Sequence, residues 1–497
     1  FPGYSGSLGA NGADEGVFLM TARLVSSGAE MYRDVNTHQG PLFSFFLTLL
    51  EGDPVDSRIM TAILGLVCLT GVMILSDIIA GKKAALYSGI FLSCNFLFFK
   101  ESRHVSFDLY ATTLLVLGLV PILVYLGDLK EPRKNGKNRV RPFLLLGVSG
   151  VLFSASAMSK LFAVIPAFFL GFYLLYGWYR GYGDESKRGD TLYHLIFLTT
   201  VTLVVTLVLL SIFGFEDTLK GIFLDTLDRP SMSMMERMKT TSYIIGILSV
   251  PLLFSVYALW EKRGDHRISL LAFLLLPLSL FLLVQSTIWD HYFLMIIPFT
   301  SVLGSVGLNF WLKRYRRDKN ERRNGRDVGP NLRFLRSMAI VVVTIFVVIS
   351  GGINILMLAT TDENIERRVA DDISDITQPG EMMISGDPII SIYADRDQPE
   401  EATNLAQLRF PSIDSDYLIN VTAQQEVSIV VLTYNLVNYE KYVDFIKDHF
   451  EFYRGYKRPD FVSDIEGDVE IHLNTFNVYI RPVWMDQETM MDLYYGN

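Results

Sequence analysis

An acidic pair, Asp14-Glu15, stands near the start of the chain and is the first candidate for proton chemistry. A carboxylate held at a membrane face loses part of its hydration, which raises its pKa toward the working pH and suits it to act as a general base. Asp14 is therefore a candidate catalytic base, with Glu15 as its neighbour. The alternative is structural: Asp14 would cap a helix over 15–27, and Glu15 would complement the helix dipole. Asp34, beside Arg33 on the same segment, is either a supporting acid or a solvated turn residue.

Charged residues crowd the short segment that contains Lys100, Glu101, Arg103, His104 and Asp108. Asp108 begins an apolar run, and ionisable groups at membrane depth are usually functional. We expect Asp108 to pair with Arg103, so that each holds the other in a site. The remaining residues either line this site or extend from helix ends toward the membrane interface.

Two further positions place polar side chains beside apolar runs. Lys160 falls in the break between two short runs, where a cation either binds a lipid phosphate or simply lies at the interface. Asp290-His291-Tyr292 begins another run. His38 and His291 are weak candidates to share a divalent metal with a carboxylate, because two histidines so far apart in the sequence are poor evidence, and hydrogen-bonded structural roles are favoured for both. No residue pattern requires a cofactor, although a divalent metal is compatible with these side chains.

The composition sets the class of protein that must position these residues. Half of the 497 residues are hydrophobic and the mean hydropathy is +0.30, well above that of an ordinary soluble domain. Several apolar runs approach or exceed about 20 residues, the length that crosses about 30 Å of hydrocarbon. The sequence therefore predicts a polytopic α-helical membrane protein with ten spans, at 56–79, 84–99, 107–126, 143–158, 161–179, 192–213, 241–260, 268–286, 291–312 and 337–358.

The distribution of charge between the spans predicts their orientation. Lysine and arginine dominate the loops 127–142 and 313–336, and such loops remain cytoplasmic by the positive-inside rule. The carboxylate-bearing segments then lie on the outer face of the plasma membrane, together with the active site and the C-terminal residues. The first 55 residues need an upstream segment to deliver them there, so we expect at least one further N-terminal span.

Two domains are predicted. Residues 1–358 form the transmembrane domain, whose first outer loop, 1–55, contains an amphipathic helix over 15–27 and an interfacial helix over 41–50 that begins at Pro41. Residues 359–497 carry 27 acidic and 10 basic residues, so they are unsuited to binding nucleic acid. Strands expected at 381–385, 427–433, 468–473 and 476–481 alternate with helices expected at 363–376, 388–394, 414–425 and 438–450. This alternation predicts an α/β domain with a largely parallel sheet.

Several of these motifs together resemble the GT-C superfamily of membrane glycosyltransferases, in particular its protein O-mannosyltransferase-like and aminoarabinose-transferase-like branch. The resemblance covers roughly residues 10–310. Its most specific parts are the acidic pair, in Asp14-Glu15-Gly-Val-Phe-Leu-Met-Thr-Ala-Arg23, and the Gly-Pro-Leu motif. It includes the following segments: Gly28, Tyr32-Arg33-Asp34, His38-Gln39-Gly40-Pro41-Leu42, Arg103-His-Val-Ser-Phe-Asp108, Gly147 to Lys160, and His291-Tyr-Phe-Leu-Met-Ile-Ile-Pro298.

The resemblance implies the transfer of one sugar from a polyprenyl- or dolichyl-phosphate donor in the membrane to a glycan, lipid or protein acceptor. It makes Asp14 the base and Glu15 its neighbour, with Asp34 and Asp108 as supporting acids. Relatives often have a phosphate-binding lysine where this chain has Gln39-Gly40. Phosphate binding is therefore left to Arg103, His104, Lys160 or Arg23, and further site candidates are Tyr32, His38, Gln39, Asp290, His291 and Tyr292.

Other functions remain open at this point. The only Trp-Asp, Trp289-Asp290, follows Ile288, whereas oligosaccharyltransferases of the superfamily carry Trp-Trp-Asp; this argues against transfer of a whole oligosaccharide. A transporter or lipid flippase with an outer solute-binding domain is the main alternative. It predicts ionisable groups deep inside spans and repeated broken helices, whereas the charges here cluster at span ends and no repeat is seen. A non-catalytic scaffold for the outer domain is a third hypothesis.

Overall fold

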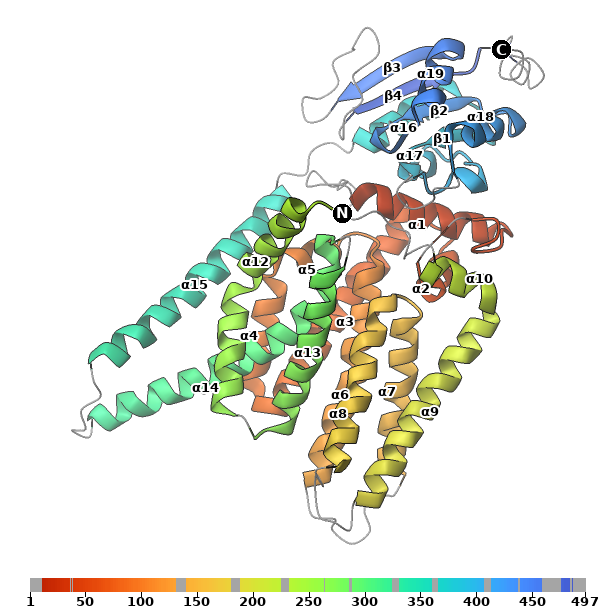
Figure 1. The fold of residues 1–497 in the computed structure, drawn as a ribbon. Coiled ribbons are helices and arrows are strands. Elements are labelled where there is room, and N and C mark those ends of the chain that lie inside the picture. The colour runs from red at the N-terminus through yellow and green to blue at the C-terminus, as the bar shows by residue number, and fades with distance from the viewer. Residues whose placement is uncertain are drawn as a thin grey trace. The chain divides into compact units, whose positions relative to one another are not determined.

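The computed structural model consists mainly of helices, with one small sheet (Figure 1). It divides into two compact units. Unit 1 combines Phe1–Arg58, Phe213–Pro230 and Thr360–Asn497, and unit 2 combines Ile59–Ile212 with Ser231–Ala359. The units thus differ from the predicted division into 1–358 and 359–497, because two segments of the transmembrane part join the C-terminal residues. The described residues are 11–35, 37, 39–130, 140–179, 188–224, 232–262, 264–285, 288–323, 330–359, 365–405, 413–436, 439–457, 475–482 and 485.

Within the described residues, eight helices are long and apolar enough to cross a membrane, which confirms a polytopic membrane fold. The segments are Pro54–Ala80 (α3), Phe107–Asp128 (in α6, Phe107–Lys130), Leu161–Tyr179 (η1, Leu161–Ala163, with α8, Val164–Tyr179), Asp190–Ile212 (in α9, Arg188–Ile212), Met234–Glu261 (α12), His266–Val284 (α13), Asp290–Arg317 (η4, Asp290–Ile296, with α14, Ile297–Arg323) and Met338–Leu356 (in α15, Pro330–Ala359).

The other two predicted spans differ from a single long helix. The span predicted at 84–99 is broken into α4, Lys82–Ser93, and α5, Phe96–Glu101. Asn95 causes the break, because its side chain accepts a hydrogen bond from the Phe98 amide and so caps a new helix. The span predicted at 143–158 is α7, Arg141–Ala157, which has 17 residues.

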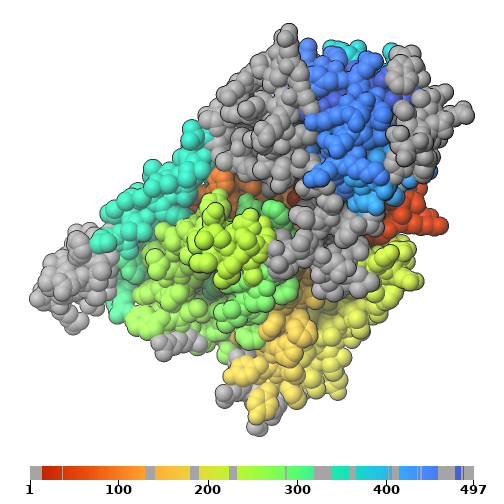
Figure 2. Space-filling model, turned by 45° about the horizontal axis from the view of Figure 1, so that its top comes forward, coloured from red at the N-terminus to blue at the C-terminus, as the bar shows by residue number. Residues whose placement is uncertain are grey.

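Packing within unit 2 is uneven. The apolar stretch of η4 and α14 is 94% buried, whereas those of α9 and α15 are only 11% and 6% buried. Figure 2 shows α15 along one edge of the unit, where many of its side chains between residues 338 and 356 are exposed. Glycines let α14 approach α12 closely: a Cβ at Gly304 would lie 2.7 Å from the Pro251 carbonyl oxygen, and one at Gly307 would collide with that of Phe254.

Unit 1 contains the first helices, a short middle segment and the small sheet. Its helices before the sheet are α1, Asn11–Ser26; α2, Pro41–Thr48; α10, Phe215–Leu219; and the π-helical turn η3, Lys220–Leu224. The expected amphipathic character of 15–27 is not seen, since α1 is buried continuously from Glu15 to Ala22. A helix that is buried on every side needs partners on every side.

The sheet in unit 1 is mixed, so the expectation of a largely parallel sheet was wrong. The described strands have the order β1-β2-β4-β3, and among them only the β1–β2 pair is parallel. β3 was missed because its polar, bulged edge sequence lacks the apolar alternation of a half-buried strand. The strand predicted at 468–473 lies outside the described residues. The elements are α16, Ile365–Ile376; β1, Met383–Ser385; α17, Pro388–Tyr393; η5, Glu400–Ala402; α18, Ser415–Gln424; β2, Ile429–Leu432; η6, Tyr434–Leu436; α19, Glu440–His449; β3, Glu451–Lys457; and β4, Thr475–Ile480.

Candidate active site

The acidic pair lies in the first turns of α1, and its two members have different surroundings. The helix begins at Asn11, so Asp14 lies inside the first turn and is not its cap; its side chain is partly exposed. Glu15 is 1% exposed, and its two carboxylate oxygens each accept a hydrogen bond from Arg58 at 2.8 Å. A buried bidentate pair of this kind fixes geometry strongly. Asp14 is therefore the member of the pair that is more accessible for proton transfer.

Arg58 is a residue that sequence reasoning missed. It lies near the start of α3 and was counted among the residues of an apolar span, yet its side chain is only 7% exposed. The available signal was an arginine at the boundary of that span, where a cation needs a carboxylate partner once it is buried.

The loop after α1 is held by its own polar groups. Asp34 accepts a hydrogen bond from the Glu30 amide at 2.8 Å, so its carboxylate closes a turn. Tyr32 has a left-handed backbone (φ 70°), and its hydroxyl donates to the carbonyl of Gln39, which is itself buried. Burial raises the pKa of Tyr32 well above its ordinary value, so this phenol remains a donor. His38 lies outside the described residues.

Arg23, one of the four phosphate candidates, has carboxylate partners in the C-terminal part of unit 1. Its guanidinium lies 2.7 Å from Asp395 and 3.6 Å from Asp397. Its positive charge is thus matched by two negative charges, which makes it less suited to binding a phosphate than the other candidates.

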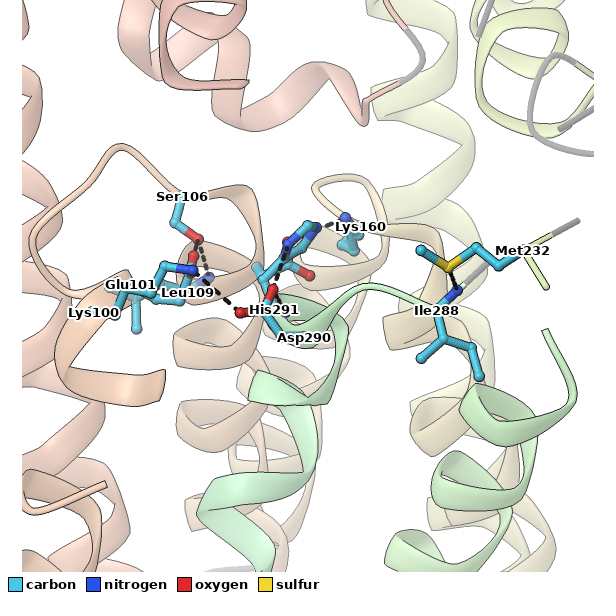
Figure 3. A network of polar contacts seen from close by, with 10 residues as sticks. Lys100, Glu101, Ser106, Leu109, Lys160, Met232, Ile288, Asp290 and His291 are labelled. Carbon is cyan, nitrogen blue, oxygen red and sulfur yellow. Dashed lines mark hydrogen bonds and ion pairs between the residues drawn. The ribbon is translucent and has the colours of Figure 1, made fainter. Parts of the chain in front are cut away.

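A second group of charged residues lies in unit 2, where it links three loops (Figure 3). Lys160 Nζ lies 3.2 Å from Asp108 Oδ2, and that same oxygen lies 3.9 Å from His291 Nε2. The other ring nitrogen of His291, Nδ1, lies 3.6 Å from Asp290, which pairs with Lys100 at 3.2 Å. The structure thus brings together five residues from α5, α6, the α7–α8 turn and η4, and we call them the charge network.

Lys160 is the cation of this network with the most unusual surroundings. Its side chain is only 9% exposed, and its ammonium lies 4.7 Å from the ring centroid of Tyr292 and 5.5 Å from that of Phe162. Rings of this kind stabilise a desolvated cation through their negative faces. Its partner Asp108 is also buried, and Asp108 Oδ1 has no hydrogen-bond partner. A buried acceptor without a partner is costly, and it is a natural contact for a ligand.

The remaining candidates on this side of unit 2 have local partners. His104 Nδ1 donates to the Lys100 carbonyl oxygen at 2.9 Å, so this imidazole holds its own loop together. The guanidinium of Arg103 lies 5.5 Å from the ring centroid of Phe99. The expected pairing of Arg103 with Asp108 was wrong, since Asp108 pairs instead with Lys160 and His291. Glu101, which sequence reasoning did not select, accepts a hydrogen bond from Ser106 at 2.7 Å.

No cluster of three or more histidine, cysteine or carboxylate side chains suited to a metal ion occurs within the part of the chain that the structure describes. His291 contacts two carboxylates, but Lys160 shares the same Asp108 oxygen, and Lys100 pairs with the other oxygen of Asp290.

Comparisons with known proteins give a fold but no close relative. No family model and no curated protein matches the sequence. Among solved structures, ArnT from Cupriavidus metallidurans bound to undecaprenyl phosphate has 15% identity and a TM-score of 0.63, over 95% of this chain and 94% of that one. The same protein in the apo state gives 12% identity and a TM-score of 0.60, over 94% and 92%. The archaeal oligosaccharyltransferase AglB from Archaeoglobus fulgidus, in complex with an inhibitory peptide and a dolichol-phosphate, has 12% identity and a TM-score of 0.52, over 98% and 74%.

Proposed function

Because this chain has the GT-C fold, we propose that it is a glycosyltransferase that uses a polyprenyl- or dolichyl-phosphate sugar as donor. It would move a single sugar to an acceptor hydroxyl at the outer face of the membrane. Two of the similar structures contain undecaprenyl phosphate or dolichol-phosphate, which supports a lipid-phosphate donor.

The proposed reaction is an inverting displacement. Asp14 takes the proton of the acceptor hydroxyl while the hydroxyl oxygen bonds to the anomeric carbon of the sugar. The bond from that carbon to the lipid-phosphate oxygen breaks, and its electron pair leaves with the phosphate. Lys160 stabilises the charge that grows on this phosphate.

The burial of Lys160 is the single observation that carries the proposal. Removing an ammonium from water costs free energy, and here two aromatic rings and one carboxylate offset only part of that cost. A cation kept in such a place is a candidate for binding an anionic ligand. A phosphate dianion would compete with Asp108 for this cation and match its charge. Asp108 Oδ1 would then accept a hydrogen bond from a hydroxyl group of the sugar.

The other candidates have supporting roles in this proposal. Glu15 is held by Arg58 and fixes the first turn of α1, while Asp34 shapes the following loop. Lys100, Asp290 and His291 hold Asp108 and Lys160 in place. Mannose is the first sugar to test, since the sequence resembles a protein O-mannosyltransferase-like branch.

The test is a transfer assay with purified protein. A panel of undecaprenyl- and dolichyl-phosphate sugars is supplied with candidate acceptors, and the released lipid phosphate is measured. We expect release by the wild-type protein, and a loss of turnover of about 10²- to 10⁴-fold in Asp14→Asn, the usual contribution of a positioned general base. Lys160→Met should also lower turnover.

Matched controls separate catalysis from folding. Glu30→Gln changes an exposed acid of the same loop, and Lys83→Met an exposed lysine of unit 2, so both should turn over like wild type. Near-normal activity of Asp14→Asn would show that Asp14 is not the general base. Lipid movement without any release of lipid phosphate would favour a flippase instead.

A further inference from the structure

Helix α1, which carries Asp14, is contacted closely by backbone from two other segments of unit 1. On one side the turn after α2 approaches it at Gly52, where a Cβ would lie 3.1 Å from the Arg23 nitrogen and would collide with the Leu19 carbonyl. Gly52 also has a positive φ of 68°, which glycine adopts without strain. On another side α1 meets α17, and a Cβ at Gly16 would collide with the backbone nitrogen of Ile389.

The end of α17 adds an ion pair to this contact. Asp395 lies two residues after the end of that helix, and its carboxylate lies 2.7 Å from the Arg23 guanidinium. Asp395 has a left-handed backbone (φ 51°), a conformation that costs free energy in a residue other than glycine and persists only where its surroundings enforce it.

Arg396 provides that enforcement. This buried arginine donates hydrogen bonds to the carbonyl oxygens of Ala394 and Asp395 at 2.9 and 3.0 Å. It also bonds both the hydroxyl and the carbonyl oxygen of Thr377 at 2.9 Å, at the end of α16. The turn that presents Asp395 to Arg23 is thus fixed to the body of the C-terminal α/β structure.

We propose that this C-terminal structure holds α1 in place through α17 and the Asp395 turn, and that it thereby positions Asp14. Gly16, Arg23 and Asp395 are positioning residues: none of them needs to touch substrate, and each acts through the placement of α1. The catalytic half of this inference rests on the proposed function. Displacement of a reacting group by about 1 Å can cost on the order of 100-fold in rate, so a modest shift of α1 is sufficient to matter.

The two kinds of contact predict effects of different size. The Gly16–Ile389 contact is backbone against backbone, and Gly16→Ala must push α17 away. In the Arg23–Asp395 pair the side chains are 29% and 79% exposed, so the pair contributes little to the free energy of unfolding. Its main effect is on the orientation of α1. Arg23→Ala and Asp395→Ala therefore leave a folded protein whose α1 is less restrained.

The test combines hydrogen exchange with kinetics on the full-length purified protein. We expect Gly16→Ala to speed amide exchange over residues 14–26 by about tenfold, since local opening follows local contacts. The same variant should lower kcat by roughly 10- to 100-fold with little change in the donor KM, as expected for a misplaced group. Arg23→Ala should show smaller changes of the same kind, whereas Arg23→Lys, which keeps a positive charge beside Asp395 and Asp397, should retain most of kcat.

Two control variants make the result specific. Gly171→Ala adds a methyl group in α8 where nothing lies within 4 Å, and Asp416→Ala removes the exposed ion pair with Lys441 in the same C-terminal structure. Both should leave exchange over residues 14–26 unchanged.

The outcomes are distinguishable. Unchanged exchange over residues 14–26 in both Gly16→Ala and Arg23→Ala overturns the inference, whatever the activity. Faster exchange with unchanged kcat overturns the positioning role. If wild-type protein transfers no sugar, the proposed function and the catalytic half fall together, while the exchange data alone decide whether the C-terminal structure holds α1.

Discussion

Adjacent acidic residues in this chain have different surroundings. Asp14 and Glu15 are adjacent carboxylates, yet Glu15 is buried and fully bonded to Arg58, whereas Asp14 is partly exposed. Separate environments of this kind let two adjacent carboxylates take different roles. The same logic applies to Asp108, of which one oxygen holds Lys160 and the other has no partner.

Glu101 provides a pH-dependent prediction. Burial raises the pKa of this carboxyl above its ordinary value, against the opposing effect of His291 and Lys100. The folded protein therefore holds the proton more tightly than the unfolded chain. The contribution of Glu101 to the free energy of unfolding is greatest below the ordinary glutamate pKa of about 4.3, and it falls as the pH rises through the folded value.

Glu101→Gln should remove this dependence while keeping an acceptor for Ser106. We expect the variant to match wild type near pH 4 and to be more stable at neutral pH, by about 1.4 kcal/mol for each unit by which the pKa is raised. Thermal unfolding in detergent between pH 4 and 8 measures the difference. A constant difference across this range would contradict the assignment.

Single residues of the charge network could be predicted from the sequence, but their pairing could not. Asp108, Lys160, Asp290 and His291 were each selected because they stand at the ends of apolar runs. Their partners lie on other helices, so proximity in sequence suggested the wrong partner, Arg103, for Asp108. The bond between Glu15 and Arg58 was missed for the same reason.

Among the elements, α14 depends most on close packing. Gly304 and Gly307 face the backbone of α12, and the buried η4 turn with Asp290 and His291 leads directly into α14. A change in the α12–α14 distance therefore reaches the charge network through one continuous helix.

We expect Gly307→Ala to force α12 and α14 apart and to lower the free energy of unfolding by about 1–3 kcal/mol, the usual cost of overpacking. Gly246→Ala is the matched control, because a Cβ there meets nothing within 4 Å and alanine favours a helix. Denaturant or thermal unfolding of the two variants gives the comparison. Equal free energies of unfolding for the two variants would contradict this prediction, because they would show that α12 can move away from α14 without loss of stability.

Most long helices could be predicted because an apolar run of span length admits few alternatives. The division of 84–99 at Asn95 could not, since a single capping side chain outweighs an otherwise continuous run. Strand β3 also escaped prediction, because a polar edge strand takes its structure from its neighbour β4 and not from its own pattern.

At the scale of the molecule, unit 1 sets a condition on the membrane topology. Its three segments are distant in the sequence but form one compact body, so they must emerge on the same side of the membrane. An even number of crossings between them satisfies this condition. Six helical passes separate the first two segments if α4–α5 and α7 each cross, and four separate the last two.

Thiol labelling tests this arrangement. Single cysteines that replace Glu30, Glu216 or Lys447, in a background with Cys68→Ala and Cys94→Ala, should react with an impermeant reagent from one side of sealed vesicles. Cysteines that replace Lys83 or Gly264 should react only after permeabilisation, because these positions follow an odd number of passes. Labelling of both sets from one side would contradict the ten-pass count.

Because unit 1 is assembled from segments that are distant in the sequence, it can be completed only late in synthesis. The helix with Asp14 leaves the ribosome early, but Ile389 and Asp395, its partners, are made more than three hundred residues later. Contacts at such separation form late because loop closure must precede them. A nascent or truncated chain would thus insert its first helices before α1 has its C-terminal partners. If the proposed function is correct, a partial chain would not transfer sugar until translation is complete.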